Sequence, residues 1–180
     1  SVTIIGEGAF YRCSSLASIA IPNSVITIGN GAFSTCSSLT SITIPDSVTS
    51  IGKGAFKGCE RLTSIVVAEG NTMYDSRQNC HAIIQTDTDA LICGCQSTTI
   101  PDGVKSIDKR AFDGCKKLTS ITLPDSVTSV GECAFYDCSS LTSITFQGTI
   151  AQWEEIILQD DWNNEVPAKV VHCTDGDVEI

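Results

Sequence analysis

The chain has 180 residues, and its 42% apolar content excludes an intrinsically disordered protein. Eleven Lys and Arg against 21 Asp and Glu give a formal net charge of -10, the wrong sign for binding nucleic acid through its phosphates. No stretch reaches the roughly 18 consecutive apolar residues of a membrane span, so we expect no membrane insertion in this segment. Because the sequence begins at Ser1 without a signal-like region, we expect an N-terminally truncated chain.

A repeat of about 23 residues organises the sequence from its first residues. Equivalent phenylalanines, leucines and cysteines recur at this spacing, with a single spacing of 56 residues that leaves room for one longer coil. The equivalent residues are Phe10, Phe33, Phe56, Phe112 and Phe135; Leu16, Leu39, Leu62, Leu118 and Leu141; and Cys13, Cys36, Cys59, Cys115 and Cys138.

The best-preserved unit is residues 39–59, LTSITIPDSVTSIGKGAFKGC. Its first part alternates at period 2 and is rich in β-branched residues, which predicts a short strand with Ile42 and Ile44 pointing inward. Pro45 ends this strand because it lacks an amide donor, and a second short extended segment follows up to Gly52. The final segment is too short for a stable helix, so we expect one tight helical turn at most.

One unit of this length buries too few apolar side chains to offset the conformational entropy that it loses on folding, so the units must stack. We therefore predict a β-rich repeat solenoid with short helical turns, a right-handed leucine-rich-repeat-like stack of coils of about 23 residues. Within this one domain we expect regular repeats over 1–66, an irregular longer coil with a β-hairpin over 67–100, regular repeats over 101–147 and a C-terminal cap over 148–180.

In the irregular coil, the segments AIIQ and ALIC predict a hairpin that turns near residues 87–88. This register pairs Ile84 with Leu91 and sets Cys80 opposite Cys95, which makes the two cysteines a disulfide candidate. Free thiols and a metal site are the alternatives for these residues. The five repeat cysteines differ, because stacking makes their Cβ vectors parallel, which favours buried free thiols over inter-coil bridges.

The sequence offers little support for a metal, a cofactor or catalysis. Cys80, Cys93 and Cys95 would share one strand face and His81 the other, which leaves zinc without a clear fourth ligand. His81 and His172 are the two histidines of the chain, and neither has a recognisable orienting group or oxyanion donor beside it. Acidic clusters at 86–89, 159–161 and 174–177 lack the spacing of a calcium loop. We therefore predict no metal site, no cofactor, no catalytic residue and no enzymatic activity.

The C-terminal segment departs from the repeat and reads as a cap. TIAQ resembles a capping box that starts at Thr149, so we predict a helix over about 150–158 with Ile150, Trp153 and Ile157 facing the last coil. Trp153 and Trp162 are interpreted as packing residues, with ligand stacking as the alternative. The Asp-Gly pair within 174–177 predicts a tight hairpin near the end of the chain.

The pattern LxxIxIP…VxxIGxxAFxxC resembles the BspA-like leucine-rich repeats of bacterial and some protozoan surface proteins. The resemblance implies a secreted or cell-surface protein, with adhesion to host matrix proteins or other cells described for some members. It supplies no catalytic residue to transfer. Ala68 and Gln147 stand where regular units have Pro, and Asp108 and Arg110 replace two glycines. We expect these departures to mark altered turns.

Outward-facing residues of the first strand of each unit should form two rows of small side chains. In leucine-rich repeats this strand surface usually faces the ligand, so we predict a surface-displayed protein-binding or adhesion module whose partner is an extracellular protein or glycan. A structural spacer is the alternative, in which the rows form only a solvated β face. The rows are Ser18, Ser41, Ser64, Ser120 and Ser143, and beside them Ala20, Thr43, Val66, Thr122 and Thr145.

Overall fold

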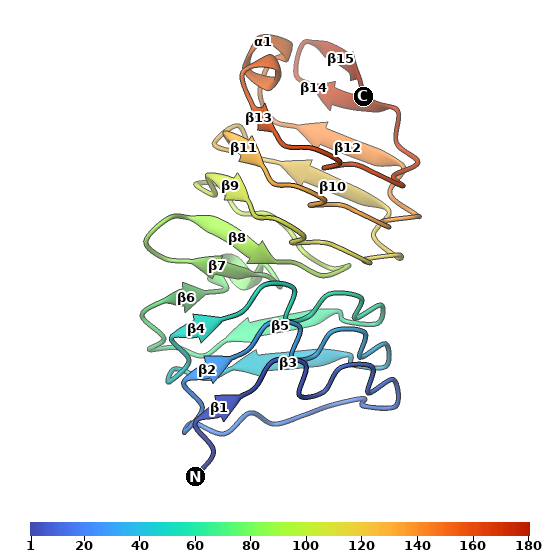
Figure 1. The fold of residues 1–180 in the computed structure, drawn as a ribbon. Helices are drawn as coiled ribbons and strands as arrows, with labels where there is room; N and C mark the ends of the chain where they lie inside the picture. Colours follow the sequence, from blue (N-terminus) through green and yellow to red (C-terminus); the bar gives the residue numbers. More distant parts are fainter.

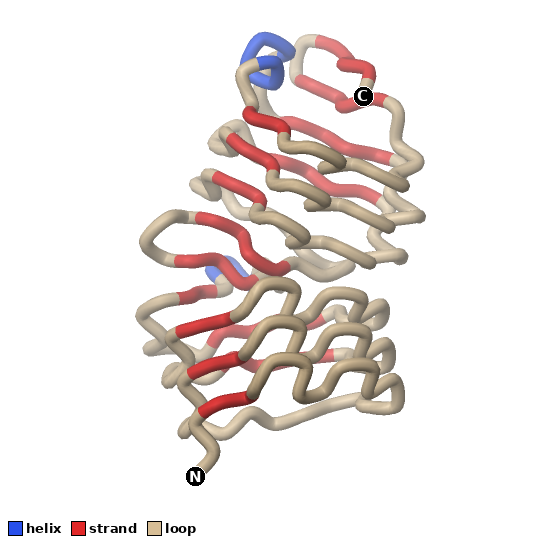
Figure 2. Tube along the Cα trace, in the orientation of Figure 1, coloured by secondary structure: helices blue, strands red, loops and turns tan.

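Successive repeats form successive coils of a β-solenoid, and the coils stack along one axis between the two chain ends (Figure 1). The computed structural model describes all residues 1–180. Each coil passes along two faces that carry strands and returns through a side made of turns (Figure 2). The predicted repeat solenoid is confirmed, because strands of neighbouring repeats pair in parallel at the repeat spacing.

The first face, called here the long-strand face, carries the four-residue strands that the alternating pattern predicts. Ile42 lies beside Ile65, and Ile121 lies beside Ile144 in the next pair of coils. Ile42 and Ile44 point into the interior and are buried, as predicted. The strands of this face are β3 (Ser41–Ile44), β5 (Ser64–Val67), β10 (Ser120–Leu123), β12 (Ser143–Phe146) and β14 (Val170–Cys173).

The second face, called the short-strand face, carries two-residue strands because the chain bends directly after each of them. A Cβ added at Gly29 or Gly52 would lie 2.6 or 2.3 Å from the backbone of the coil beneath, so these bends stack closely only with glycine. The parallel strands of this face are β1 (Ile4–Ile5), β2 (Thr27–Ile28), β4 (Ser50–Ile51), β9 (Ser106–Ile107), β11 (Ser129–Val130) and β13 (Ile157–Leu158).

The third side of the coil, called the turn side, contains no helix in the regular repeats. The segment stays within the expected limit of one tight helical turn, because a residue in the left-handed region interrupts it, as Gly54 does with a φ of 61°. The turns stack through hydrogen bonds between coils instead. The amide of Phe33 donates to the carbonyl oxygen of Ala55 at 2.8 Å.

Phenylalanine rings stack along the inside of the turn side. The ring centroids of Phe10 and Phe33 lie 5.1 Å apart, those of Phe33 and Phe56 lie 5.4 Å apart, and those of Phe112 and Phe135 lie 5.0 Å apart. The stack is broken between Phe56 and Phe112, because the irregular coil between them supplies no equivalent phenylalanine.

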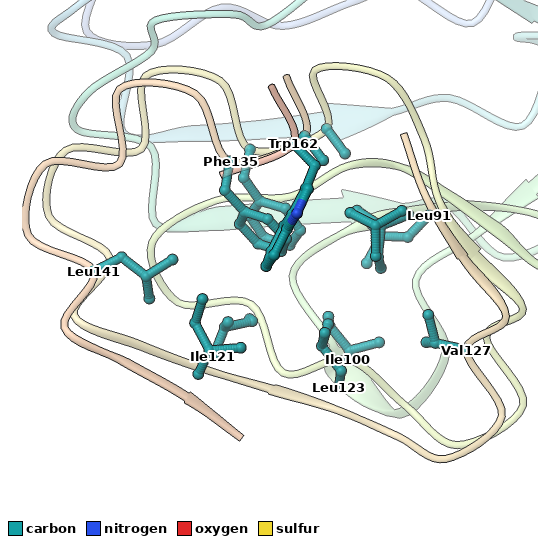
Figure 3. Packing of buried hydrophobic residues seen from close by; sticks show 14 of the residues in the cluster. Leu91, Ile100, Ile121, Leu123, Val127, Phe135, Leu141 and Trp162 are labelled. Carbon is teal, nitrogen blue, oxygen red and sulfur yellow. The ribbon is translucent and has the colours of Figure 1, made fainter. Parts of the chain in front are cut away.

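The buried apolar side chains fall into two clusters, one of 20 residues in the N-terminal coils and one of 26 residues in the C-terminal coils. In the larger cluster, Phe135 and Trp162 lie together inside the coils (Figure 3). The chain therefore consists of two well-packed blocks of coils, which meet at the irregular coil.

The irregular coil contains β6 (Tyr74–Asp75), the 3-10 turn η1 (Arg77–Asn79), β7 (Ile83–Gln85) and β8 (Ala90–Cys93). Strands β7 and β8 form the predicted antiparallel hairpin, and Ile84 pairs with Leu91 as predicted. A β-bulge between Ile83 and Ile84 shifts the register beyond this point, so that Ile83 pairs with Cys93.

The disulfide predicted between Cys80 and Cys95 is not formed, and both residues are free cysteines. The bulge moves them out of the expected pairing, and they pack into different interiors. Cys80 belongs to the C-terminal cluster and Cys95 to the N-terminal cluster. The Cys95 thiol donates a hydrogen bond to the carbonyl oxygen of His81, with the sulfur 3.3 Å from that oxygen.

The C-terminal cap contains a short helix, α1 (Ile150–Glu154), and its N-terminus has the predicted capping box between Thr149 and Gln152. The helix ends four residues earlier than predicted because the chain turns into β13, so Ile156 is buried while Ile157 is 66% exposed. The predicted C-terminal hairpin is formed by β14 and β15 (Gly176–Glu179).

The regular turn is kept at Asp108, Arg110 and Ala68, whereas the chain after Gln147 enters α1, as the expectation of altered turns requires. The amide of Ala111 donates to the carbonyl oxygen of Asp108 at 3.2 Å, the same bond and length that Ala55 forms with Gly52. Ala68 and Gln147 each restore an amide that proline lacks. Each amide donates 2.9 Å across to the preceding coil, to the carbonyl oxygens of Ile44 and Leu123.

Candidate functional site

The structure aligns the two predicted rows on the long-strand face. Ser41 pairs directly with Ser64 and Thr43 with Val66, and the same register joins Ser120 to Ser143 and Thr122 to Thr145. Both rows are divided by the irregular coil into an N-terminal and a C-terminal part. We call these aligned residues the serine and threonine rows.

Ser18 and Ala20 extend the rows by one coil without forming a strand of their own. Both residues are exposed. The amide of Thr40 donates to the carbonyl oxygen of Ala17 at 3.2 Å, which holds the first coil in line with the second. The rows therefore begin in the first coil, as predicted.

The hydroxyl groups of the rows are free, whereas those of neighbouring residues hold the coils together. Thr40, Thr63 and Thr142 each precede a row serine, and each donates its hydroxyl to a carbonyl oxygen of the preceding coil at 3.3, 3.2 and 3.4 Å. No hydroxyl of the serine and threonine rows has a hydrogen-bond partner within the protein. The rows therefore present unpaired donors and acceptors to the solvent or to a ligand.

The threonine row ends in a histidine that the sequence analysis did not place on this surface. Thr145 pairs with His172 on β14, and the Nδ1 atom of His172 lies 2.8 Å from a carboxylate oxygen of Asp177. The hairpin signal at residues 174–177 was the only indication, because His172 lies outside the repeat whose spacing defines the rows.

The repeat cysteines form a ladder of free, mostly buried thiols, as predicted. Their sulfur atoms donate hydrogen bonds to phenylalanine carbonyl oxygens of the preceding coil. These bonds are 3.1 Å for Cys36, 3.2 Å for Cys59 and 3.2 Å for Cys138. Burial raises the pKa of both Cys59 and Cys138 to about 12, so these thiols stay protonated and unreactive near neutral pH.

The residues considered as metal ligands or catalytic groups do not come together in a metal site or an active site. No group of three or more His, Cys, Asp or Glu side chains is arranged to hold a metal ion. Burial raises the pKa of the Cys93 thiol, and it holds the pKa of the Cys95 thiol above its ordinary value as well. Protonated thiols are poor nucleophiles. None of the helices combines the length and the apolar character that a membrane-spanning helix needs.

Trp153 and Trp162 are packing residues and not ligand-stacking surfaces. Both are buried, with exposed fractions of 3% and 7%. Their ring centroids lie 5.9 Å apart in an edge-on arrangement, and the Trp153 ring meets Phe146 in the same way at 5.5 Å. The two tryptophans therefore close the core of the last coil.

The chain matches a family model described as a BspA type leucine rich repeat region, with six copies over residues 1–86 and 91–164. It is similar to the crystal structure of a leucine rich cell surface protein from Faecalibacterium prausnitzii, with 26% identity, a TM-score of 0.66 and coverage of 97% of this chain and 58% of that one. A leucine-rich repeat protein from Bacteroides ovatus is 24% identical, with a TM-score of 0.56 and coverage of 97% and 47%. The chain thus spans about half the length of these structures. No curated protein matches it.

Proposed function

Because the chain belongs to the BspA-type leucine-rich repeat family, we propose that it is a non-enzymatic, surface-displayed module that binds an extracellular protein or glycan. The binding surface is the pair of serine and threonine rows. The observation that carries this proposal is the free state of the row hydroxyls beside Thr40, Thr63 and Thr142, whose hydroxyls bond to the preceding coil. Display at the cell surface is supported by the relative from F. prausnitzii, which is described as a leucine rich cell surface protein.

The shape of the rows favours an extended ligand. Their side chains are small, so the surface offers no pocket for a single large anchor, and a partner must supply its own bulky groups. Parallel coils repeat the row hydroxyls about every 4.8 Å along the solenoid axis. An extended polypeptide or a polysaccharide that runs along this axis can meet several hydroxyls in succession.

The proposal is tested with lysine substitutions in the rows and matched lysine substitutions on the other strand face. Thr43→Lys and Thr122→Lys place a long charged side chain in the threonine row. Thr49→Lys and Thr128→Lys, at exposed positions beside the short-strand face, change the charge equally. Retention on immobilised host matrix proteins and cell-wall polysaccharides is measured by biolayer interferometry.

We expect the row variant to lose at least tenfold in affinity and the control variant to bind like the unsubstituted protein. Equal binding by both variants, or no retention of the unsubstituted protein on any surface of the panel, would overturn the proposal.

A structural spacer is the second candidate, and the elongated stack with its chain ends at opposite ends supports it (Figure 1). A spacer works by length, so removal of one whole regular coil would change the function of the full-length protein while the lysine substitutions in the rows would not. The two candidates are therefore separated by the same set of row variants.

A further inference from the structure

A pocket lies where the two blocks of coils meet, and we call it the junction pocket. On the turn side the irregular coil contributes no turn, so the turns before and after it contact each other directly. The amide of Gly58 donates to the carbonyl oxygen of Asp113 at 3.1 Å. Beside this contact the coils do not fill the space, and a pocket of about 250 Å³ remains between residues 51–62, residues 108–115 and parts of the irregular coil.

Asp108 lines this pocket at a position where the regular coils require glycine. A Cβ at the equivalent Gly29, Gly52 or Gly131 would lie 2.6 Å or less from the coil beneath. Asp108 is exposed and keeps its side chain, because the coil beneath it is the irregular one. The aspartate therefore occupies a bend where the coil beneath leaves room for a side chain.

Arg110 lines the same pocket in a strained backbone conformation. Its φ is 61°, equal to that of the equivalent Gly54, in the left-handed region that residues with a side chain rarely adopt. Its guanidinium lies 2.5 Å from the carboxylate of buried Asp113. Asp108 and Arg110 thus place charged groups at the junction pocket.

Basic residues are concentrated around the pocket of this acidic protein. Segments 53–61 and 108–117 hold seven of the 11 Lys and Arg of the chain but only three of its 21 Asp and Glu. Four of these basic residues line the pocket together with two acidic ones. The four basic residues are Lys53, Lys57, Lys109 and Arg110.

The positive charge at the pocket is only partly neutralised. Lys57 and Arg110 share the single carboxylate of Asp113, and Lys109 pairs with Glu132 at 2.6 Å. Lys53 is exposed and forms no ion pair. The four basic residues therefore outnumber Asp108, Asp113 and Glu132, which leaves a net positive charge, and Phe56 and Ile92 add apolar surface to the lining.

We propose that the junction pocket binds a carboxylate carried on a single ring, with Lys53 and Arg110 as the groups that recognise the anion. Charge-assisted hydrogen bonds to Lys and Arg favour an anion, and Arg can hold a carboxylate through two parallel bonds. The pocket is smaller than the roughly 300 to 1,000 Å³ of drug-sized sites, so it takes one ring and not a long ligand. Such a ring comes either from an acidic sugar of a glycan or from a free aromatic acid.

The residues that line the junction pocket belong to the short-strand face, the turn side and the irregular coil, and none belongs to the serine and threonine rows. The proposal is therefore independent of the extended binding surface. Loss of matrix binding in the row variants would leave the pocket intact, and loss of the pocket would leave the rows intact.

The test is a titration of the whole chain with glucuronate, benzoate and the neutral sugar glucose by isothermal calorimetry. We expect glucuronate or benzoate to bind, glucose not to bind, and the affinity to fall with added salt. Preference for glucuronate identifies a glycan as the source of the ring, and preference for benzoate identifies an aromatic acid.

Lys53→Gln is expected to weaken binding at least tenfold, and Arg110→Gly, which restores the glycine of the repeat, should do the same. Lys105→Gln removes an exposed lysine outside the pocket and is expected to leave the affinity unchanged. Absence of binding by both acids at millimolar concentration, or equal losses in Lys53→Gln and Lys105→Gln, would overturn the proposal.

Discussion

Gly58 and Gly114 lie against each other where the two blocks of coils meet, and a Cβ added to Gly114 would lie 2.9 Å from the Cα atom of Gly58. Two ion pairs flank this contact. The Nζ atom of Lys57 lies 3.3 Å from the carboxylate of Asp113, and that of Lys116 lies 3.1 Å from the carboxylate of Glu60. The turn side therefore joins the two blocks through backbone contact, which side chains reinforce.

Substitution of Gly114 by alanine should weaken this joint. The change introduces a left-handed alanine at a φ of 79° and forces the two turns apart, so we expect a loss of about 2–3 kcal/mol in the free energy of unfolding. Gly103→Ala is the matched control, because its φ is 89° but an added Cβ meets nothing within 4 Å. Urea unfolding of both variants measures the difference, and equal losses would show that the close approach has no energetic effect.

The stacked phenylalanines should contribute unequally along the ladder. Phe33 is fully buried between Phe10 and Phe56, so Phe33→Ala leaves a cavity and should lower the free energy of unfolding by about 3–5 kcal/mol. Phe10 lies at the end of the stack and is only partly buried. Phe10→Ala should cost clearly less in the same chemical denaturation experiment, and a larger cost for Phe10 than for Phe33 would contradict the ladder.

The buried thiol of Cys138 should make stability depend on alkaline pH. Its pKa is about 12 in the folded protein and near 9.0 when unfolded. Between these values the unfolded chain loses a proton that the folded chain retains, so the stability that the thiol contributes is complete below about pH 9 and is lost as the pH rises toward 12. By about pH 10.5 this loss reaches about 2 kcal/mol.

Comparison of the unsubstituted protein with Cys138→Ala isolates this effect. The difference in their free energies of unfolding should narrow by about 2 kcal/mol between about pH 8 and pH 10.5. Val127→Ala also removes buried atoms but no titrating group. The difference in free energy of unfolding between this variant and the unsubstituted protein should therefore stay constant over the same pH range. A constant difference for Cys138→Ala would contradict the assigned burial of the thiol.

The sequence predicted the regular coils well because the strand register between neighbouring coils follows directly from the repeat spacing. Once Ser41 and Ser64 occupy equivalent positions in successive units, parallel stacking pairs them directly, and the structure pairs them so. The inward direction of Ile42 follows from the same alternation. The serine and threonine rows needed no information beyond this spacing.

The structure around the irregular coil was predicted poorly, because it depends on contacts with neighbouring coils that the repeat spacing does not define. The bulge beside Ile83 separates Cys80 from Cys95, and nothing in the local sequence marks it. Asp108 and Arg110 were visible as departures from the repeat, but their meaning depends on the pocket that the irregular coil leaves beneath them. Only the fold brings these two residues, Lys53 and Asp113 together.

Asp113 contributes both to the contact between the two blocks and to the charge of the junction pocket. Its neutral variant should therefore lower the free energy of unfolding and raise the affinity for an acid. Asp113→Asn leaves Lys57 and Arg110 without their shared carboxylate. Both basic side chains keep about a third or more of their surface exposed, so water compensates part of the loss, and we expect a cost of about 1–3 kcal/mol. The freed guanidinium of Arg110 should then bind glucuronate or benzoate more tightly. Asp125→Asn, an exposed change of the same charge, should alter neither quantity, and weaker acid binding by Asp113→Asn would contradict the role assigned to Arg110.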